Sequence, residues 1–308
     1  MKNEQLAGHL AVAGAYTIYG LNIVFNKDIA NVGIVSPMMM FFLRAAGATA
    51  LFWLLSLFMP KEPVAKKDFV PIALASVTGL FITQVSFLLA IPMSTSIDTS
   101  IVATLSPVFT MFFAFIFLGE PITWKKVLGV AVSLFGILLL IFNSTHNVGA
   151  VAKTAPLGFV LLFLNSISFA TYLGAFRIVI SRYSVVTFMK WSFLFSLILC
   201  IPFAYEDILT TDYAALPAKT VWEIIYVVVM ATFVAYFLIP YGQKRIRPTL
   251  VSMYTYLQPI IAVIISIASG LDVISWQKGL AILLVFSGVF LVIRSRAAVQ
   301  PASESIRK

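Results

Sequence analysis

Polar side chains recur at helical spacing inside stretches of the sequence that are otherwise apolar. Tyr16, Tyr19, Asn22 and Asn26 fall on one helical face of the first such stretch. A hydroxyl or amide buried among apolar atoms costs free energy unless it finds a hydrogen-bonding partner or faces water. These side chains therefore either bond to neighbouring helices or face a polar cavity in which a small solute could be bound.

Similar polar positions occur in two distant parts of the chain. The stretch around Gln84 matches the stretch around Tyr236, while Tyr254 and Gln258 lie one helical turn apart. Small hydroxyls usually join membrane helices, at about 0.6 kcal/mol per contact, but the recurrence of amides and tyrosines in both parts favours a cavity. The residues predicted to line this cavity are Tyr19, Asn22, Arg44, Thr83, Gln84, Phe87, Tyr172, Trp191, Tyr236, Tyr254 and Gln258.

Arg44 is the cation that lies deepest in an apolar stretch, about 12 Å from its outer end at the α-helical rise of 1.5 Å per residue. An arginine facing lipid at that depth would be costly, so its side chain is expected to point inward. Two roles remain open: bonding to carbonyls and amides of neighbouring helices, or binding a carboxylate or phosphate of a solute. Lys190 lies nearer the end of its stretch and is expected to extend to the interface.

Pro107 and Pro259 lie halfway along two of the apolar stretches. Each removes a backbone donor and clashes with the preceding turn, which predicts a helix kink at both positions. Matching interruptions in two halves of a chain are a sequence indication of a transporter binding site. The alternative is a packing kink without contact to a solute, since membrane helices tolerate proline.

Residues for catalysis are missing from the sequence. The histidines, His9 and His146, lie far apart, and a single cysteine, Cys200, excludes an internal disulfide and a multi-cysteine metal site. Acidic residues fall at the ends of apolar stretches or between them, with Glu120 expected to anchor a loop near Lys125 and Lys126. We therefore expect no enzyme activity, no cofactor, no metal and no carboxylate proton relay at mid-span.

The elements that carry these residues are apolar stretches long enough to cross a bilayer. Of 308 residues, 61% are hydrophobic and 11% are charged, against about 25% charged in a soluble domain. About 20 apolar residues span the bilayer core as a helix, which pairs every backbone group internally. The predicted fold is all-α and membrane-embedded, with ten spans at about 6–26, 36–58, 69–91, 97–118, 124–142, 155–179, 186–204, 220–241, 248–268 and 274–294.

The basic residues are distributed unequally between the two sets of loops. With a cytoplasmic N-terminus, the inner segments hold fifteen lysines and arginines and the outer segments four, so both termini are predicted to be cytoplasmic. This distribution explains the net charge of +9 without nucleic acid as a partner. The expected partners are the lipid bilayer and a small-molecule substrate, and a homodimer is left open. Trp191 is away from the span ends where the other tryptophans form an interfacial belt.

The chain contains an internal repeat. LSPVFTMFFAFIFLGEPITWKK from Leu105 aligns without a gap with LQPIIAVIISIASGLDVISWQK from Leu257, and the longer alignment of 104–141 with 256–293 has nine identities in 38 positions. Each copy holds five predicted spans. Because five is odd, the second copy must enter the membrane from the opposite side, as in the inverted repeats of many secondary transporters.

Here the sequence resembles a known family. The run AIPMSTSIDTSIVATLSPVFTMFFAFIFLGEP from Ala90 and its counterpart ending at Asp272 are similar to tandem EamA domains of bacterial ten-helix drug/metabolite transporters. The second copy has Leu271 and Asp272 where the family usually has Gly-Glu. On this basis the chain is divided into a first repeat (6–142), a linker (143–154), a second repeat (155–294) and a cytoplasmic tail (295–308).

The resemblance implies a substrate cavity between two four-helix sets, with the fifth and tenth helices packed to one side. It also implies a secondary transporter in the bacterial inner membrane that exports amino acids, metabolites or drug-like compounds. Two alternatives remain: a membrane-embedded lipid-handling protein, and a structural membrane subunit without a cavity.

Overall fold

The computed structural model describes residues 2–94, 99, 102–103, 105–144, 155–261 and 276–295. Over these residues the all-helical prediction is confirmed, and no strand occurs among them. The α-helices are α1 (Lys2–Val32), α2 (Pro37–Leu57), α3 (Phe69–Ser76), α4 (Thr83–Ala90), α6 (Ser106–Leu118), α7 (Trp124–Ser144), α8 (Pro156–Ala175), α9 (Arg177–Arg182), α10 (Val185–Thr210), α11 (Ala218–Val228), α12 (Ala235–Gln243), α13 (Pro248–Met253) and α15 (Trp276–Ile293). The shorter helical turns are η1 (Lys66–Asp68), η2 (Val77–Ile82), η3 (Ile91–Met93), η5 (Tyr213–Ala215), η6 (Val229–Val234) and η7 (Tyr254–Tyr256).

Six helical segments of the described chain are long and apolar enough to cross a membrane. Large apolar side chains such as Leu57, Phe58 and Trp222 are exposed on the surface, whereas the amides of Asn22 and Gln243 are buried. An apolar exterior around a partly polar interior is what a hydrocarbon solvent requires, so the protein is a multi-pass membrane protein. The six segments are Asn3–Val32, Pro37–Leu57, Lys66–Met93, Pro156–Ala175, Val185–Thr210 and Ala218–Gln243; Ser106–Leu118 and Gly279–Ile293 are shorter apolar helices.

Several helix ends differ from the sequence prediction. α1 continues to Val32 and not to residue 26, and it ends before Gly33, whose φ of 74° only glycine adopts at little cost. α2 then begins after Ser36, whose hydroxyl accepts a hydrogen bond from the Met39 amide. α10 continues to Thr210 instead of ending near residue 204. α7 extends through Ser144, two residues into the predicted linker. Residues 145–154, like residues 296–308 of the tail, lie outside the described residues.

The predicted mid-helix position of Pro107 is corrected by the structure. α6 begins at Ser106, so Pro107 lies in its first turn, where a missing N–H has no intrahelical partner to lose. The regular helix is interrupted at Leu105, whose amide bonds to the Val102 carbonyl at 3.0 Å. In the second copy the tight turn η7 lies just before Pro259. Both interruptions thus lie on the N-terminal side of the proline.

Two spans each contain one π-helical turn. η2 joins α3 to α4, and η6 joins α11 to α12, so that each set of three segments forms one continuous span. The two turns are six residues long and begin 152 residues apart, which is the offset between Leu105 and Leu257 in the sequence repeat. A π-helical turn leaves backbone carbonyls out of the regular ladder and often occurs at functional sites.

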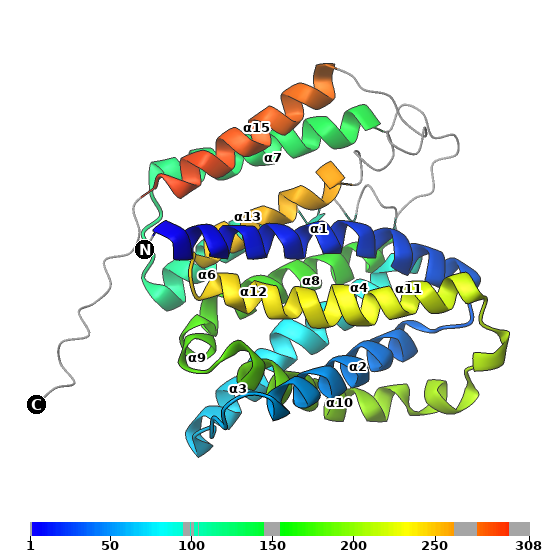
Figure 1. Ribbon diagram of the computed structural model, residues 1–308. Coiled ribbons are helices and arrows are strands. Elements are labelled where there is room, and N and C mark those ends of the chain that lie inside the picture. Colours follow the sequence, from blue (N-terminus) through cyan, green and yellow to red (C-terminus); the bar gives the residue numbers. More distant parts are fainter. Residues whose placement is uncertain are drawn as a thin grey trace, which may run out of the picture.

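The helices pack in pairs drawn from the two halves of the chain (Figure 1). α2 packs along α10, α1 along α11 and α12, and α8 along α4 and α6. α7 and α15 pack on each other at one side of this group. Their backbones approach so closely that a Cβ on Gly288 would lie 2.3 Å from the Gly129 carbonyl oxygen, and the Ser133 hydroxyl donates to the Val285 carbonyl across the contact. Small residues of this kind let membrane helices touch along their backbones.

Candidate functional site

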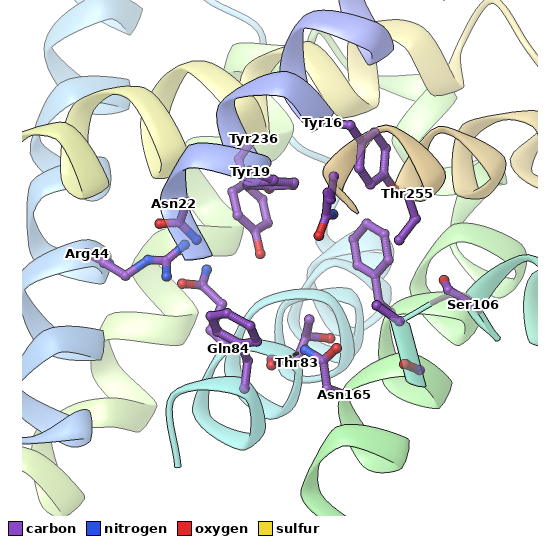
Figure 2. Close-up of a pocket in the computed structure, with 15 residues that line it drawn as sticks. Tyr16, Tyr19, Asn22, Arg44, Thr83, Gln84, Ser106, Asn165, Tyr236 and Thr255 are labelled. Atoms are coloured by element: carbon purple, nitrogen blue, oxygen red, sulfur yellow. Dashed lines mark hydrogen bonds between the residues drawn. The ribbon is translucent and has the colours of Figure 1, made fainter. Parts of the chain in front are cut away.

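A polar cavity lies in the middle of the helix group (Figure 2). The space within it that small molecules can occupy is about 110 Å³. Segments from both halves of the chain contribute to it. The lining residues are Tyr16, Tyr19 and Asn22 of α1; Arg44 of α2; Thr83, Gln84 and Phe87 of α4; Ala103, which precedes α6; Ser106 of α6; Asn165, Ser166 and Phe169 of α8; Tyr236 of α12; Thr255 of η7; and Gln258, which follows η7.

Eight of the eleven residues predicted to line a cavity are brought together here, and three lie elsewhere. The ring of Tyr172 packs against Gly79, where a Cβ would come within 2.3 Å of the ring. Trp191 packs edge-on against Trp53, with ring centroids 5.4 Å apart. The hydroxyl of Tyr254 lies 2.8 Å from Nδ1 of His9. These three side chains pack against other parts of the protein and do not line the cavity.

The cavity also contains residues that the sequence prediction did not include. Three pairs of lining positions are separated by the repeat offset of 152 residues. From the predicted Gln258 this offset leads to Ser106, which is one of the missed positions. The pairs are Gln84 with Tyr236, Ala103 with Thr255, and Ser106 with Gln258.

Arg44 lies at one end of the cavity and is 3% exposed. Its Nε donates to the Thr232 hydroxyl at 2.9 Å, and that hydroxyl donates to the Val227 carbonyl at 2.7 Å across the π-helical turn η6. The guanidinium reaches from α2 toward the amides of Asn22 and Gln84 (Figure 2). One nitrogen is thus anchored to the protein, and the other two point into the site.

The opposite wall uses the first π-helical turn. Thr83 donates from its hydroxyl to the Thr78 carbonyl at 2.6 Å, and Ser168 donates to the same carbonyl at 2.8 Å. The amide of Asn165 donates to the Thr83 carbonyl at 2.7 Å. The Thr78 carbonyl of η2 and the Thr83 carbonyl just after it are therefore bound by side chains of α4 and α8, which fixes the polar wall of the cavity in place.

Several cavity side chains are buried but make no hydrogen bond of standard geometry to the protein. They are both amide atoms of Gln84 and the hydroxyls of Tyr16, Tyr19 and Ser106. Tyr19 and Gln84 lie beside the Tyr236 hydroxyl, and Tyr16 lies beside Thr255, at distances too long or angles too poor for a strong bond. A buried polar group without a partner costs about 1–3 kcal/mol, so these groups are suited to binding water or a polar solute.

A buried charge cluster joins the two halves at one end of the helices. Gly119, with φ of 64°, ends α6, and Glu120 turns back so that its carboxylate pairs with Lys126 at 2.7 Å. This confirms the expected loop anchor. Arg177, which follows α8, contacts the same carboxylate at 3.5 Å, and so does the Thr249 hydroxyl of α13. Burial lowers the pKa of Arg177 from its ordinary value, and the Glu120 charge opposes this change.

Metal chemistry finds no support in the part of the chain that the structure describes. No group of three or more His, Cys, Asp or Glu side chains there could hold a metal ion. Cys200 is buried among apolar residues of α2 and α10. The described cavity can form hydrogen bonds, contact aromatic rings and bind a negative charge at Arg44.

The fold and the cavity define a class of protein: a multi-pass, all-helical membrane protein that encloses a polar site between its two halves. The chain belongs to the EamA-like transporter family, whose model matches residues 6–142 and again residues 156–294. This assigns it to the membrane transporters.

Comparison with individual proteins agrees with this assignment. The chain is 22% identical to the uncharacterized transporter YetK of Bacillus subtilis over 98% of this chain and 92% of that protein. It is 21% identical to an uncharacterized transporter of Archaeoglobus fulgidus over 93% of this chain and 99% of that protein. A solved crystal structure that is 17% identical in sequence has the same fold, with a TM-score of 0.73 over 94% of this chain and 97% of the other.

Proposed function

We propose that this protein is a secondary transporter that carries small organic solutes across the bacterial inner membrane by alternating access. The observation that carries the proposal is the cavity itself, which is lined from both halves and contains buried polar groups without protein partners. Such a site is expected in a carrier, which binds its solute near the middle of the bilayer between two repeats. The proposed topology has ten spans, with both termini in the cytoplasm.

An inverted repeat is supported by features that recur at the offset of 152 residues. The two π-helical turns recur at this offset, and so do three pairs of cavity positions. The packing also recurs when the halves are exchanged, because α2 contacts η6 while α10 contacts η2. Ser133 and Val285, which bond to each other between α7 and α15, are likewise equivalent positions. We therefore assign the helix group to two copies of one bundle related by a pseudo-twofold axis.

Alternating access requires a closure that forms at one side while the other side opens. We assign the cytoplasmic closure to the cluster around Glu120. Its carboxylate comes from the first half of the chain, while Arg177 and Thr249 come from the second half. The neighbouring loops hold many of the basic residues, which supports a cytoplasmic position for this side. The direction of transport is assigned as export from the resemblance to drug/metabolite transporters.

A transport assay tests the proposal. The full chain is reconstituted in vesicles, and uptake and release are measured for a panel of amino acids, carboxylic acids, nucleosides and aromatic amines. At least one solute is expected to cross faster than in protein-free vesicles. Gln84→Ala and Gln258→Ala should each slow that flux by about twofold to about tenfold, since each loses one hydrogen bond worth about 0.5–1.5 kcal/mol. Gln5→Ala, at an exposed position of α1, is the matched control and should transport normally.

Two results would count against a carrier. One is a folded protein that moves no solute of the panel in either direction. The other is transport that survives unchanged in both cavity variants, because the solute would then take a route that avoids this cavity.

A further inference from the structure

The described cavity walls carry one formal charge, and it is positive. Arg44 lines the cavity, and none of the other described lining residues is acidic or basic. The titratable groups that act on its charge are the neutral hydroxyls of Tyr236 and Tyr19. A buried cation without a carboxylate partner is expensive to maintain, and membrane proteins that retain one generally use it.

The guanidinium is oriented for a ligand. Nε is held by Thr232 at 2.9 Å, which fixes the plane of the group, and the two terminal nitrogens point toward Asn22 and Gln84 (Figure 2). Two parallel N–H donors match the two oxygens of a carboxylate. The amide of Gln84, which has no strong protein partner, lies where it can donate to the same oxygens.

The remainder of the cavity fits an apolar body. Aromatic rings from four helices line it, namely those of Tyr16, Tyr19, Phe87, Phe169 and Tyr236. A single arginine balances one negative charge, whereas the second charge of a phosphate ester would remain buried without a partner. We propose that the transported solute is an organic monocarboxylate, with its carboxylate bound to Arg44 and its aromatic or aliphatic body among these rings. This inference rests on the proposed carrier function and names its substrate class.

The test compares acids with amides of the same shape. Binding to the purified full chain in lipid nanodiscs is measured by calorimetry for 3-phenylpropanoate and 3-phenylpropanamide, L-phenylalanine and L-phenylalaninamide, and 4-methylpentanoate and 4-methylpentanamide, with phenyl phosphate as a further arm. In at least one pair the acid should bind about tenfold to about a hundredfold more tightly than the amide, the range expected for hydrogen bonds to a charged group.

Variants identify the cation responsible. Arg44→Gln should abolish the preference for the acid, and Arg44→Lys should retain part of it, because the charge remains and the paired donors are lost. Lys190→Gln is the matched control, since Lys190 lies over the Trp53 ring and outside the cavity. It should leave the preference unchanged. The comparison of acid with amide uses the unmodified protein, so the test stands even if Arg44→Gln does not fold.

The outcomes separate this inference from the carrier function. Equal binding of acid and amide in every pair, or a preference that survives in Arg44→Gln, would overturn the inference while a carrier of neutral solutes still stands. Tighter binding of phenyl phosphate than of the acids would replace the monocarboxylate with a phosphate ester. A protein that binds and transports none of these solutes, charged or neutral, would count against both proposals.

Discussion

Replacing Glu120 by glutamine should open the cavity on the side that we assign to the cytoplasm. Glu120 is 2% exposed and Lys126 is 0% exposed, so the two charges depend on each other. In Glu120→Gln the ammonium of Lys126 stays buried without an opposite charge. The side chain of Arg177 is 25% exposed and can reach water, so the loss of the Glu120 charge destabilises it less.

The expected magnitude follows from this burial. Removing one partner of a buried ion pair costs about 3–5 kcal/mol, because the other charge remains desolvated. A state in which the two halves separate at this end would hydrate Lys126 and avoid that cost. A relative shift of about 3 kcal/mol changes the ratio of open to closed molecules by about a hundredfold.

Cysteine labelling measures this ratio. Cys200 is buried and is replaced by serine, and Ser106→Cys then places one reactive thiol in the cavity. A membrane-impermeant thiol reagent is added on the side of the α6–α7 connection. The protein that carries Glu120→Gln in addition to Ser106→Cys should be labelled at position 106 much faster than its parent with Ser106→Cys alone. Adding Lys126→Met should reverse most of the change, because the fully buried cation is then removed and only the partly exposed Arg177 is left without the carboxylate.

An exposed ion pair serves as the control. Asp28 pairs with Lys219 at 2.8 Å, but the Lys219 side chain is 74% exposed, and such pairs contribute about 0–1 kcal/mol. Asp28→Asn should leave the labelling rate unchanged. If a folded Glu120→Gln protein labels at the parent rate from both sides, the cluster does not close the cavity and the reasoning fails.

Three further changes test the packing and the loops. Gly288→Ala should lower the unfolding temperature in detergent, because the added Cβ would collide with Gly129 of α7. Gly279→Ala should leave the unfolding temperature unchanged, because no atom lies within 4 Å of its added Cβ, and equal effects of the two variants would refute the close contact. The Gln243 amide donates to a backbone carbonyl of α8 at 2.8 Å, and Gln243→Leu leaves that carbonyl without its donor. The free energy of unfolding should fall by about 1–3 kcal/mol, and an unchanged value would contradict this. Partial burial alone would raise the pKa of Glu62, but hydrogen bonds from the start of α10 lower this pKa from 4.5. The wild type should therefore lose stability relative to Glu62→Gln as the pH falls below 4.5. Unfolding free energies that change in parallel with pH in the two proteins would contradict this expectation.

The sequence predicted the helices and much of the cavity because both depend on local patterns. Long apolar stretches define membrane helices directly, and Tyr19 and Asn22 follow helical spacing within one of them. Gln84 and Tyr236 were identified by comparing the two repeats. These residues lie at the cavity because equivalent positions of two similar bundles face the same space.

The remaining features depend on contacts that no local pattern specifies. Tyr172 was expected at the cavity, but the absence of a side chain at Gly79, on another helix, provides a packing site for its ring. The π-helical turns have no clear sequence signature, although they determine which carbonyls Thr83 and Thr232 bind. The burial of Lys126 could not be read from its position near a helix start, where lysines usually reach water.

The proposed opposite orientation of the two repeats can be tested with a pair of single-cysteine proteins. Pro121→Cys and Val273→Cys occupy equivalent positions of the two copies and are made in the Cys200→Ser background. In intact cells and in inverted vesicles, an impermeant thiol reagent should reach position 121 from the cytoplasm and position 273 from outside. Labelling of both positions from the same side would contradict the inverted repeat, and with it the alternating exposure of one shared cavity.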